Sequence, residues 1–386
     1  MTATIHEPEG AQRVPVVSYN RELSPAALRQ LRLLASMPYV EERVVAMADA
    51  HLADGVAVGS VFATTHAVVP AALGGDIGCG MCALRFDLHA PTLDRRDLQQ
   101  ALSALAKAIP VGTEGHSAKG ARLPDSLAEA ALSTSSLEHE KERLAPRQLG
   151  TLGGGNHFVE LERDGGGCLW VLVHSGSRGM GGEVRNHHAA AAKARLDLPI
   201  PALDTREDTG RAYLEDVTWA LAYARENRRV MLNRVCEVLA DLFGAEADDG
   251  SMVDVHHNFV ARERHGEHGY LVHRKGAVAA PAGATVIIPG SMGTASYLAE
   301  GLGERVSFGS SSHGAGRVMS RGDARAKVRP GELARAMGKV VYDERRARAL
   351  VEEAPQAYRD IGEVMEDQGE LVRAVVRLAP LVVLKG

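Results

Sequence analysis

The spacing of apolar residues predicts a chain that mixes helices and strands. Residues 24–45 have the pattern of a helix followed by a turn, and Ser24 is a suitable N-cap for that helix. Residues 211–244 carry apolar side chains at helical spacing and end in Gly244, a natural helix stop. We therefore expect a helical segment within residues 1–45 and a second, insertion-like helical segment over residues 211–244.

Short apolar runs bounded by glycine predict buried strands. Residues 55–88 contain several such runs, and "CLWVLV" from Cys168 to Val173 is followed by the polar His174. "TVII" and "RVSF" also run into glycine loops, the second continuing into a helix, and residues 119–148 are charged and helix-like. Glycine loops are spread from residue 74 to residue 316 with no repeat or linker between them. This distribution favours a single α+β domain over residues 1–386.

Composition limits the classes of partner. The net charge is −5, so contact with nucleic acid must come from a local basic patch. An aromatic content of 4% argues against a stacking platform for single strands. Four cysteines are too few for a disulfide scaffold, and no apolar run is long enough to cross a membrane. We expect a cytoplasmic protein with no membrane partner.

Several glycine-rich motifs carry metal-binding residue types. In "GGDIGCGMC", Asp76 and Cys79 offer an oxygen and a thiolate; the alternatives are a tight turn with a buried cysteine or a CxxC with Cys82. In "LGTLGGGNHFVEL", His157 is a candidate ligand and Asn156 and Glu160 are candidate nucleoside contacts, unless the motif is a hairpin with a structural histidine.

Three imidazoles complete the candidate set. His174 lies at the mouth of a buried strand with Arg178 in the following loop. In "DVHHNFV" the rings of His256 and His257 face opposite sides of a strand, so only one of them can join a given site. One carboxylate, one thiolate and three imidazoles could hold two adjacent ions of Mn, Fe, Co or Zn, whereas Mg would not recruit a thiolate.

A candidate nucleophile lies in "SSSHGAGRVMS". Glycines clear space beside His313, and Arg317 can neutralise phosphate charge. The chain has no Walker loop and no Lys-x-Asp-Gly stretch, so a histidine that forms a phosphoramidate is an alternative way to activate a nucleotide. The basic residues that follow, Arg321 and Arg325 among them, predict either an RNA-binding helix or a solvated helix face paired with acids.

The order of these motifs resembles the RtcB-type RNA-splicing ligase family. The matching stretches include "DIGCGM", "LGTLGGGNHFVE", "VHSGSRG", "HRKGA", "IPGSMGTASY", "HGAGRVMSR", "EEAPQAYRDI" and "VVLKG", from about residue 48 onward. The resemblance implies a complex α+β fold of coiled mixed sheets flanked by helices. It also implies GTP and two Mn²⁺ ions as cofactors, an RNA with a 3′-phosphate or 2′,3′-cyclic phosphate and a 5′-hydroxyl end as substrate, and an archease-like activating protein as partner.

The resemblance also implies roles for individual residues. It assigns His313 as the guanylylated residue. The metal ligands would be Asp76, Cys79, His157, His174 and His257. The guanylate contacts would be Asn156, Phe158, Glu160, Ser291, Ser296, Ala315, Tyr358 and Lys385. Phosphate or RNA-end contacts would be Arg178 and Arg317.

The implied activity is ligation through a guanylylated histidine and an RNA–ppG intermediate, in RNA splicing or repair. The alternatives are a paralogue that guanylylates itself or RNA ends without efficient sealing, a metal-dependent cyclic phosphodiesterase, or a non-catalytic binder of RNA ends. The chain departs from the family pattern at Ala48 and Ala50, and "LADGVAVGS" lacks a lysine that is usual there.

Overall fold

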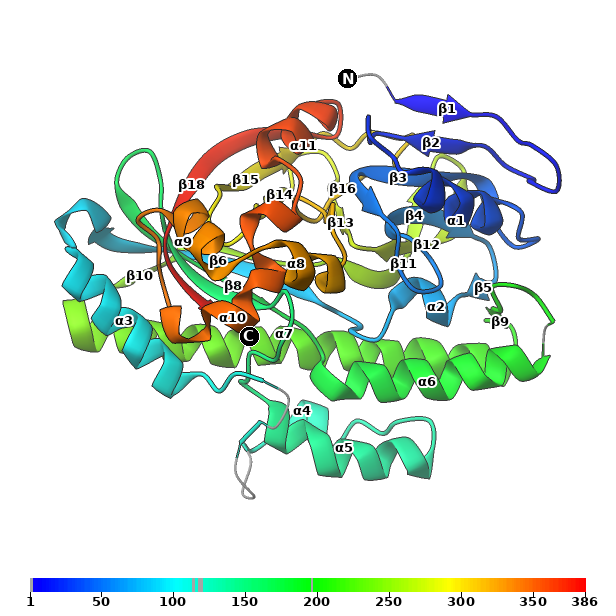
Figure 1. The fold of residues 1–386 in the computed structure, drawn as a ribbon. Coiled ribbons are helices and arrows are strands. Elements are labelled where there is room, and N and C mark those ends of the chain that lie inside the picture. The colour runs from blue at the N-terminus through cyan, green and yellow to red at the C-terminus, as the bar shows by residue number, and fades with distance from the viewer. Residues whose placement is uncertain (1–2, 113–114, 117–120, 196) are drawn as a thin grey trace.

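The structure is a computed structural model that describes residues 3–112, 115–116, 121–195 and 197–386 (Figure 1). Two large β-sheets lie side by side, and the long helices α6 and α7 run together along one side of them. Within the described residues no helix combines the length and apolar character that crossing a membrane requires. The architecture is α+β, as predicted.

The first sheet has six strands in the order β1-β2-β3-β4-β12-β11. Strands β2 and β3 pair in parallel and the other neighbours are antiparallel, so the sheet is mixed, as predicted. The strands are β1 (Thr4–His6), β2 (Val16–Ser18), β3 (Glu41–His51), β4 (Val58–Thr64), β11 (Asn258–His265) and β12 (His268–Lys275).

The second sheet has eight strands. Seven follow the order β10-β6-β8-β7-β18-β15-β14, and β17 pairs in parallel with β18. They are β6 (Gly80–His89), β7 (Phe158–Arg163), β8 (Cys168–Ser175), β10 (Ala247–His256), β14 (Thr285–Ile288), β15 (Ser296–Gly301), β17 (Val341–Tyr342) and β18 (Val372–Lys385). Two short pairs complete the strands: β13 (Ala277–Ala279) with β16 (Ser310–Ser312), and β5 (Ala67–Val68) with β9 (Leu203–Asp204).

The α-helices surround these sheets. They are α1 (Pro25–Ala35), α2 (Pro70–Leu73), α3 (Arg95–Ala108), α4 (Asp125–Ala128), α5 (Ser135–Gln148), α6 (Arg178–Arg195), α7 (Asp208–Phe243), α8 (Arg321–Lys327), α9 (Pro330–Met337), α10 (Ala347–Leu350) and α11 (Ile361–Asp367). Short 3₁₀ turns η1 (Ala90–Thr92), η2 (Glu344–Arg346), η3 (Val351–Glu353) and η4 (Pro355–Ala357) connect some of them.

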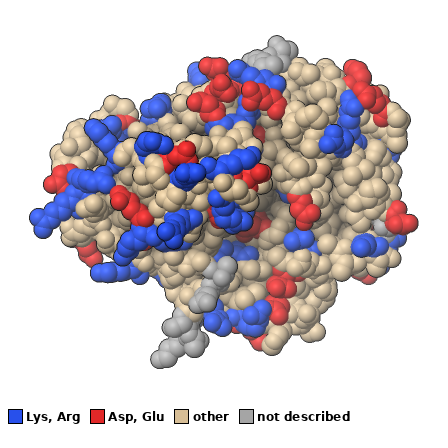
Figure 2. Space-filling model, viewed as in Figure 1, with Lys and Arg blue, Asp and Glu red and all other residues tan. Residues whose placement is uncertain are grey.

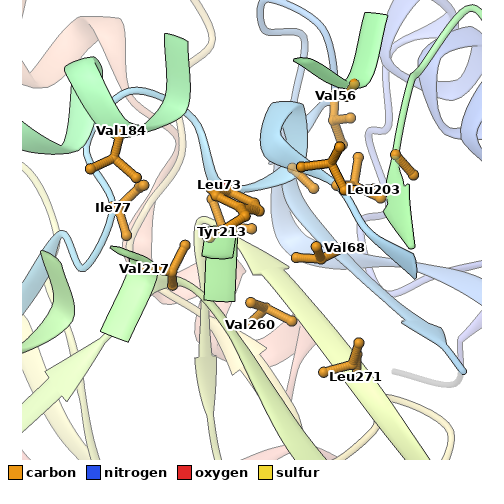
Figure 3. Packing of buried hydrophobic residues seen from close by; sticks show 14 of the residues in the cluster. Val56, Val68, Leu73, Ile77, Val184, Leu203, Tyr213, Val217, Val260 and Leu271 are labelled. Carbon is orange, nitrogen blue, oxygen red and sulfur yellow. The ribbon is translucent and has the colours of Figure 1, made fainter. Parts of the chain in front are cut away.

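A buried apolar cluster fixes α6 and α7 against α2 and the first sheet (Figure 3). Val184 of α6 and Val217 of α7 pack in the same cluster as Leu73 of α2. Val260 of β11 and Leu271 of β12 close the cluster from the sheet side. Burial of such side chains contributes about 1.5–3 kcal/mol each.

The predicted elements are largely present, but the strand expected at "RVSF" is wrong, because this stretch forms a turn and strand β16 follows it at Ser310–Ser312. Ser24 caps α1 by accepting a hydrogen bond from the Ala27 N–H, and Gly244 ends α7 in a left-handed conformation. The helical prediction for residues 1–45 is wrong beyond α1, because β1, β2 and the start of β3 occupy the same range. Helices α4 and α5 lie where a charged helical region was expected, although residues 119–120 of that stretch lie outside the described residues. A single domain for the whole chain stays a prediction.

Strand register explains why distant motifs meet. Gly80 of β6 is paired with Ser175 of β8 on one side and with His256 of β10 on the other. His174 is paired with Phe158 at the start of β7, and Phe158 is paired with Lys385 at the end of β18. Five neighbouring strands therefore have their site-bearing ends at the same edge of the second sheet.

Candidate metal and nucleotide site

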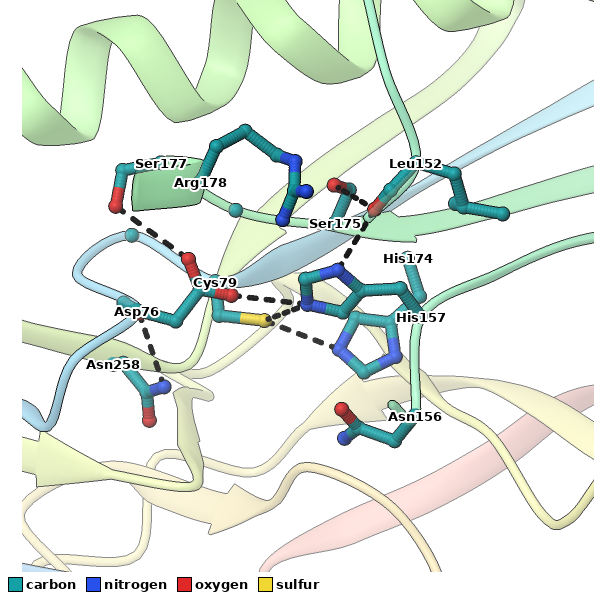
Figure 4. A network of polar contacts seen from close by, with 12 residues as sticks. Asp76, Cys79, Leu152, Asn156, His157, His174, Ser175, Ser177, Arg178 and Asn258 are labelled. Carbon is teal, nitrogen blue, oxygen red and sulfur yellow. Dashed lines mark hydrogen bonds and ion pairs between the residues drawn. The ribbon is translucent and has the colours of Figure 1, made fainter. Parts of the chain in front are cut away.

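The five predicted metal ligands converge at this edge, and Figure 4 shows Asp76, Cys79, His157 and His174 among them. The Sγ atom of Cys79 lies 3.4 Å from Nε2 of His157 and 3.3 Å from Nε2 of His174. Nε2 of His157 lies 2.9 Å from Oδ2 of Asp76, and Nε2 of His174 lies 3.3 Å from Nε2 of His257. One oxygen, one sulfur and three nitrogens therefore face a common region.

The spacing and orientation of these atoms suit a metal ion. Ligands at 2.0–2.3 Å from a tetrahedral metal are about 3.5 Å apart, close to the separations around Cys79. Nδ1 of His157 lies 2.8 Å from the Leu152 carbonyl oxygen, which places the proton on Nδ1 and leaves the Nε2 lone pair facing Cys79. Nδ1 of His174 is buried and has no hydrogen-bond partner among the described residues. The donor set fits a borderline-soft divalent ion.

Burial sets the protonation of this cluster. It lowers the pKa of His174 and of His257 well below the ordinary value, and neighbouring histidines lower both further. Burial also raises the pKa of the Cys79 thiol well above its ordinary value, with the Asp76 charge adding to the effect. For Asp76, burial alone would raise the pKa, but His157 lowers it overall. Neutral imidazoles are ready to bind a metal, whereas the thiol needs a cation to stabilise its ionised form.

The structure separates the neighbouring residues that the sequence left as alternatives. Cys82 is fully buried in an apolar cluster behind β6, so the CxxC does not form a two-thiol site. His256 directs its ring to the Gly78 carbonyl and to Arg228, away from the cluster that contains His257. The side chain of Arg228 is completely buried and donates hydrogen bonds to the carbonyl oxygens of Gly78 and Ser175, which supports both metal-site loops from α7.

A cavity of about 280 Å³ opens beside the cluster. Its wall includes four of the expected metal ligands, the candidate nucleophile and most of the expected nucleotide contacts. Those residues are Asp76, Cys79, His174, His257, His313, Asn156, Phe158, Ser291, Ala315, Tyr358, Lys385 and Arg317. His51 of β3 and Val58 of β4 also line it, so residues from both sheets and from the loop after β16 share one cavity.

His313 lies next to the metal cluster. Its ring centroid is 4.8 Å from that of His257, and Nδ1 lies 2.6 Å from Oδ2 of Asp49. The His313 backbone N–H donates to the same Asp49 oxygen over 3.2 Å. No motif in the sequence indicated a role for Asp49, which lies between the departing positions Ala48 and Ala50, where the family resemblance begins. Ala48 and Ala50, which depart from the family pattern, are buried, while His51 lines the cavity.

Two expected nucleotide contacts lie behind the cavity wall. Glu160 and Ser296 are buried and do not line the cavity, and the Ser296 hydroxyl donates to Oε1 of Glu162 over 2.8 Å. Burial raises the pKa of Glu160 well above its ordinary value, and burial raises that of Glu162 to about 7. The two carboxyl groups are in hydrogen-bonding contact, so one proton between them removes most of the repulsion. Sequence reasoning missed Glu162.

The predicted phosphate contacts occupy different sides of the site. Arg178 lies beside Asp76 and His157 (Figure 4). Its guanidinium donates to the Thr151 hydroxyl and the Gly112 carbonyl. Arg317 lines the cavity and contacts the carboxylate of Glu353 at 3.1 Å.

The basic helix after His313 is partly neutralised. Arg321 contacts Glu353 and Arg325 contacts Glu352, while Lys327 pairs with Asp323 inside α8. The structure therefore agrees with the alternative in which the basic face of this helix is paired with acids. Arg321 also lines the cavity, a position that no sequence motif indicated.

Lys275 lies against the loop "LADGVAVGS", which lacks the lysine that is usual in the family. Lys275, at the end of β12, donates to the Asp54 carbonyl over 2.9 Å and also contacts the Ala71 carbonyl. Burial lowers the pKa of Lys275 to about 8. The loop around Asp54 therefore has a cationic neighbour that its own sequence does not supply.

Comparison with known proteins agrees with this geometry. The family model described as tRNA-splicing ligase RtcB matches residues 30–386. The RNA-splicing ligase RtcB of Escherichia coli K12 is 36% identical over 93% of this chain and 94% of that protein. The RNA-splicing ligase RtcB of Mycobacterium tuberculosis is 33% identical over 92% and 99%, and the tRNA-splicing ligase RtcB of Pyrobaculum aerophilum is 30% identical over 97% and 95%. The chain belongs to the RtcB family.

Proposed function

We propose that this protein is a GTP-dependent RNA ligase. It joins RNA 3′-phosphate or 2′,3′-cyclic phosphate ends to 5′-hydroxyl ends, in RNA splicing or repair. The observation that carries the proposal is the position of His313, which lies in the cavity with Nδ1 against Asp49 and its ring beside His257. Family membership and the names of the relatives support the same activity.

His313 acts as the nucleophile of the first step. With Nδ1 facing Asp49, Nε2 keeps the lone pair that attacks the α-phosphorus of GTP. An N–P bond forms as the bond to pyrophosphate breaks, and the positive charge that develops on the ring faces the Asp49 carboxylate. Arg317 at the cavity wall neutralises phosphate charge.

The guanylate then passes to RNA. A cyclic phosphate end is first opened by water to a 3′-phosphate, whose oxygen displaces His313 from phosphorus and forms RNA–ppG. The 5′-hydroxyl oxygen attacks the RNA phosphorus of this activated end, a new phosphodiester bond forms, GMP leaves, and the hydroxyl proton passes to solvent. Each displacement exchanges one bond to phosphorus for another.

Asp76, Cys79, His157, His174 and His257 would hold two Mn²⁺ ions. When bound, these ions would stabilise negative charge on the phosphates. The guanylate would contact Asn156, Phe158, Ser291, Ala315, Tyr358 and Lys385 at the cavity wall. Glu160 and Ser296 are buried behind this wall, so the guanylate would contact them only if the wall residues in front of them moved.

The decisive experiment uses GTP labelled at the α-phosphate, with Mn²⁺ and the purified chain. We expect an acid-labile, base-stable label on the protein, which moves to RNA and then appears as GMP when a 3′-phosphate/5′-hydroxyl RNA pair is added. Label that reaches RNA without a joined product would identify a non-sealing paralogue. Opening of the cyclic phosphate with no labelling would identify a phosphodiesterase, and neither reaction would favour a non-catalytic binder.

A reducing cytoplasm is the expected location, and all four cysteines are unpaired thiols. An archease-like activating protein is an expected partner. Adding such a protein to the labelling reaction tests this expectation, because an activator would raise the amount of labelled chain at each time point.

A further inference from the structure

One buried carboxylate gathers the cations of the cavity wall. The side chain of Glu353, at the end of η3, is 2% exposed. Its Oε1 lies 3.1 Å from Nη1 of Arg317 and 3.2 Å from Nε of Arg321, and its Oε2 lies 3.6 Å from Nζ of Lys385. Oε2 also accepts a hydrogen bond from the Tyr358 hydroxyl. All four partners line the cavity, whereas Glu353 lies behind them.

The cations do not depend on Glu353 alone for their positions. Arg317 also donates to the backbone carbonyls of Met319 and Glu352, and its guanidinium lies over the Tyr358 ring at 4.9 Å. Lys385 donates to the Asn156 carbonyl over 2.9 Å. These neutral anchors would remain without Glu353. The contribution that Glu353 alone makes to these two side chains is therefore its negative charge.

A glycine leaves room for the Arg321 guanidinium at the cavity. Gly155 has a φ of +73°, and a Cβ atom there would lie only 2.9 Å from Nη2 of Arg321. A larger residue would push this guanidinium away from the loop that precedes β7. Arg321 lines the same cavity as Asn156, Phe158 and Lys385, and Nζ of Lys385 lies over the Phe158 ring.

The charges around Glu353 are unbalanced. Three cations share this one carboxylate, and the neighbouring Glu352 pairs with Arg325, which does not line the cavity. For Glu353, burial alone would raise the pKa, but Lys385, the Tyr358 hydroxyl and the two arginines lower it overall, so the carboxylate is ionised. An anion that enters the cavity meets cations whose attraction is reduced by a fixed negative charge a few ångströms behind them.

We propose that Glu353 is an internal counter-charge that weakens the binding of phosphate groups by Arg317, Arg321 and Lys385. The ligand class is a di- or triphosphate, and this identity rests on the proposed function. Loose binding lets pyrophosphate leave after it is displaced from the nucleotide. Arg321, which no sequence motif assigned to the nucleotide, is a direct phosphate contact.

The test measures binding of inorganic pyrophosphate and of guanosine to the full chain with Mn²⁺, by calorimetry. Glu353→Gln keeps the size of the side chain and removes its charge, so we expect the Kd for pyrophosphate to fall about tenfold while guanosine still binds. Glu353→Asp keeps the charge and should bind pyrophosphate like the parent protein. Glu352→Gln is the matched control, since this neighbouring acid pairs outside the cavity, and it should change neither affinity.

If Glu353 only supports the structure of the wall, removing its charge should not strengthen pyrophosphate binding. Pyrophosphate affinity that is unchanged or weaker in Glu353→Gln, with guanosine still bound, overturns the proposal. If that variant does not fold, Arg321→Gln decides, because the Arg321 side chain is half-exposed and we expect its replacement to leave the fold intact. We expect it to weaken pyrophosphate binding about tenfold with guanosine unaffected, and unchanged pyrophosphate binding overturns the proposal. The pyrophosphate and guanosine titrations do not require label on His313. Failure of the ligase mechanism is therefore detected separately, by the GTP-labelling experiment.

Discussion

Nδ1 of His313 lies 2.6 Å from Oδ2 of Asp49, a carboxylate with no exposed side-chain surface. The two residues are 264 positions apart in the chain and come from the loop after β16 and from β3. A buried carboxylate at one ring nitrogen fixes the orientation of the imidazole and leaves the other nitrogen for the cavity. The pair therefore has the geometry of an oriented nucleophile.

Removing the nucleophile should abolish labelling. We expect His313→Ala to take up no label from α-labelled GTP, while its Mn²⁺ content stays near that of the parent protein, since the five metal ligands are intact. Asp49→Asn should keep the fold and lower the rate of labelling at least about 100-fold, because the ring loses its orienting charge. Gel autoradiography with metal analysis measures both. Acid-labile, base-stable label on His313→Ala would show that another residue is guanylylated.

The two neighbouring cysteines should behave differently. Cys79 faces two histidine nitrogens, whereas Cys82 is packed in an apolar cluster. Cys79→Ala should lower Mn²⁺ affinity by at least about tenfold and activity with it, because the thiolate ligand is lost. Cys82→Ala should mainly lower the free energy of unfolding. Metal titration and chemical denaturation of both variants separate the effects, and equal losses of metal from both would favour a CxxC site instead.

Glu162 should make the protein less stable as pH rises. Burial raises its pKa from the ordinary 4.5 to about 7, so the folded protein holds a proton that the unfolded chain releases between these values. The free energy of unfolding should therefore fall between pH 4.5 and 7, by at most about 1.4 kcal/mol per pH unit from this group. Below pH 4.5 both states are protonated and the loss is absent.

Glu162→Gln removes this titration. Denaturation at pH 5, 6 and 7 should show a flatter dependence in the variant than in the parent protein, and Glu142→Gln, at an exposed position on α5, should show the parental dependence. Parallel curves for Glu162→Gln and the parent protein would mean that Glu162 is ionised in the folded state throughout this range.

The RNA path can be located by salt dependence. Lys and Arg side chains gather over α3 and α8–α10, beside the central hollow (Figure 2). Arg335, Lys339 and Arg348 in this region are exposed and have no acidic partner among the described residues, unlike Arg325 and Lys327 of α8.

We expect neutralising Arg335, Lys339 and Arg348 to weaken RNA binding for all sequences. The slope of log affinity against log salt concentration should fall by about one unit per lost phosphate contact. The double variant of Arg325 and Lys327 is the control and should change the slope less. Fluorescence titrations from low to moderate salt measure this, and a larger effect from the control pair would place RNA along α8. His313 labelling should persist in both variants, because none of these residues lines the cavity.

The sequence by itself determined the local elements and the chemistry of the loops. Helical spacing located α7 and its end at Gly244, and glycine-bounded apolar runs located β6, β8 and β14. These features depend on neighbouring residues, so a local pattern reports them. The residue types in the glycine loops indicated a mixed oxygen, sulfur and nitrogen donor set, and the order of the motifs indicated the family.

Only the tertiary structure showed which of these residues lie together. Strand register joined the ends of five strands in one place, and it agrees with the resemblance in placing His257 rather than His256, and Cys79 rather than Cys82, at the candidate site. The partners of His313, Arg317 and Arg321 are acids from distant segments, and Glu160 and Ser296 proved to lie behind the cavity wall. Such pairings depend on how β-strands and loops far apart in sequence are packed, which no local spacing encodes.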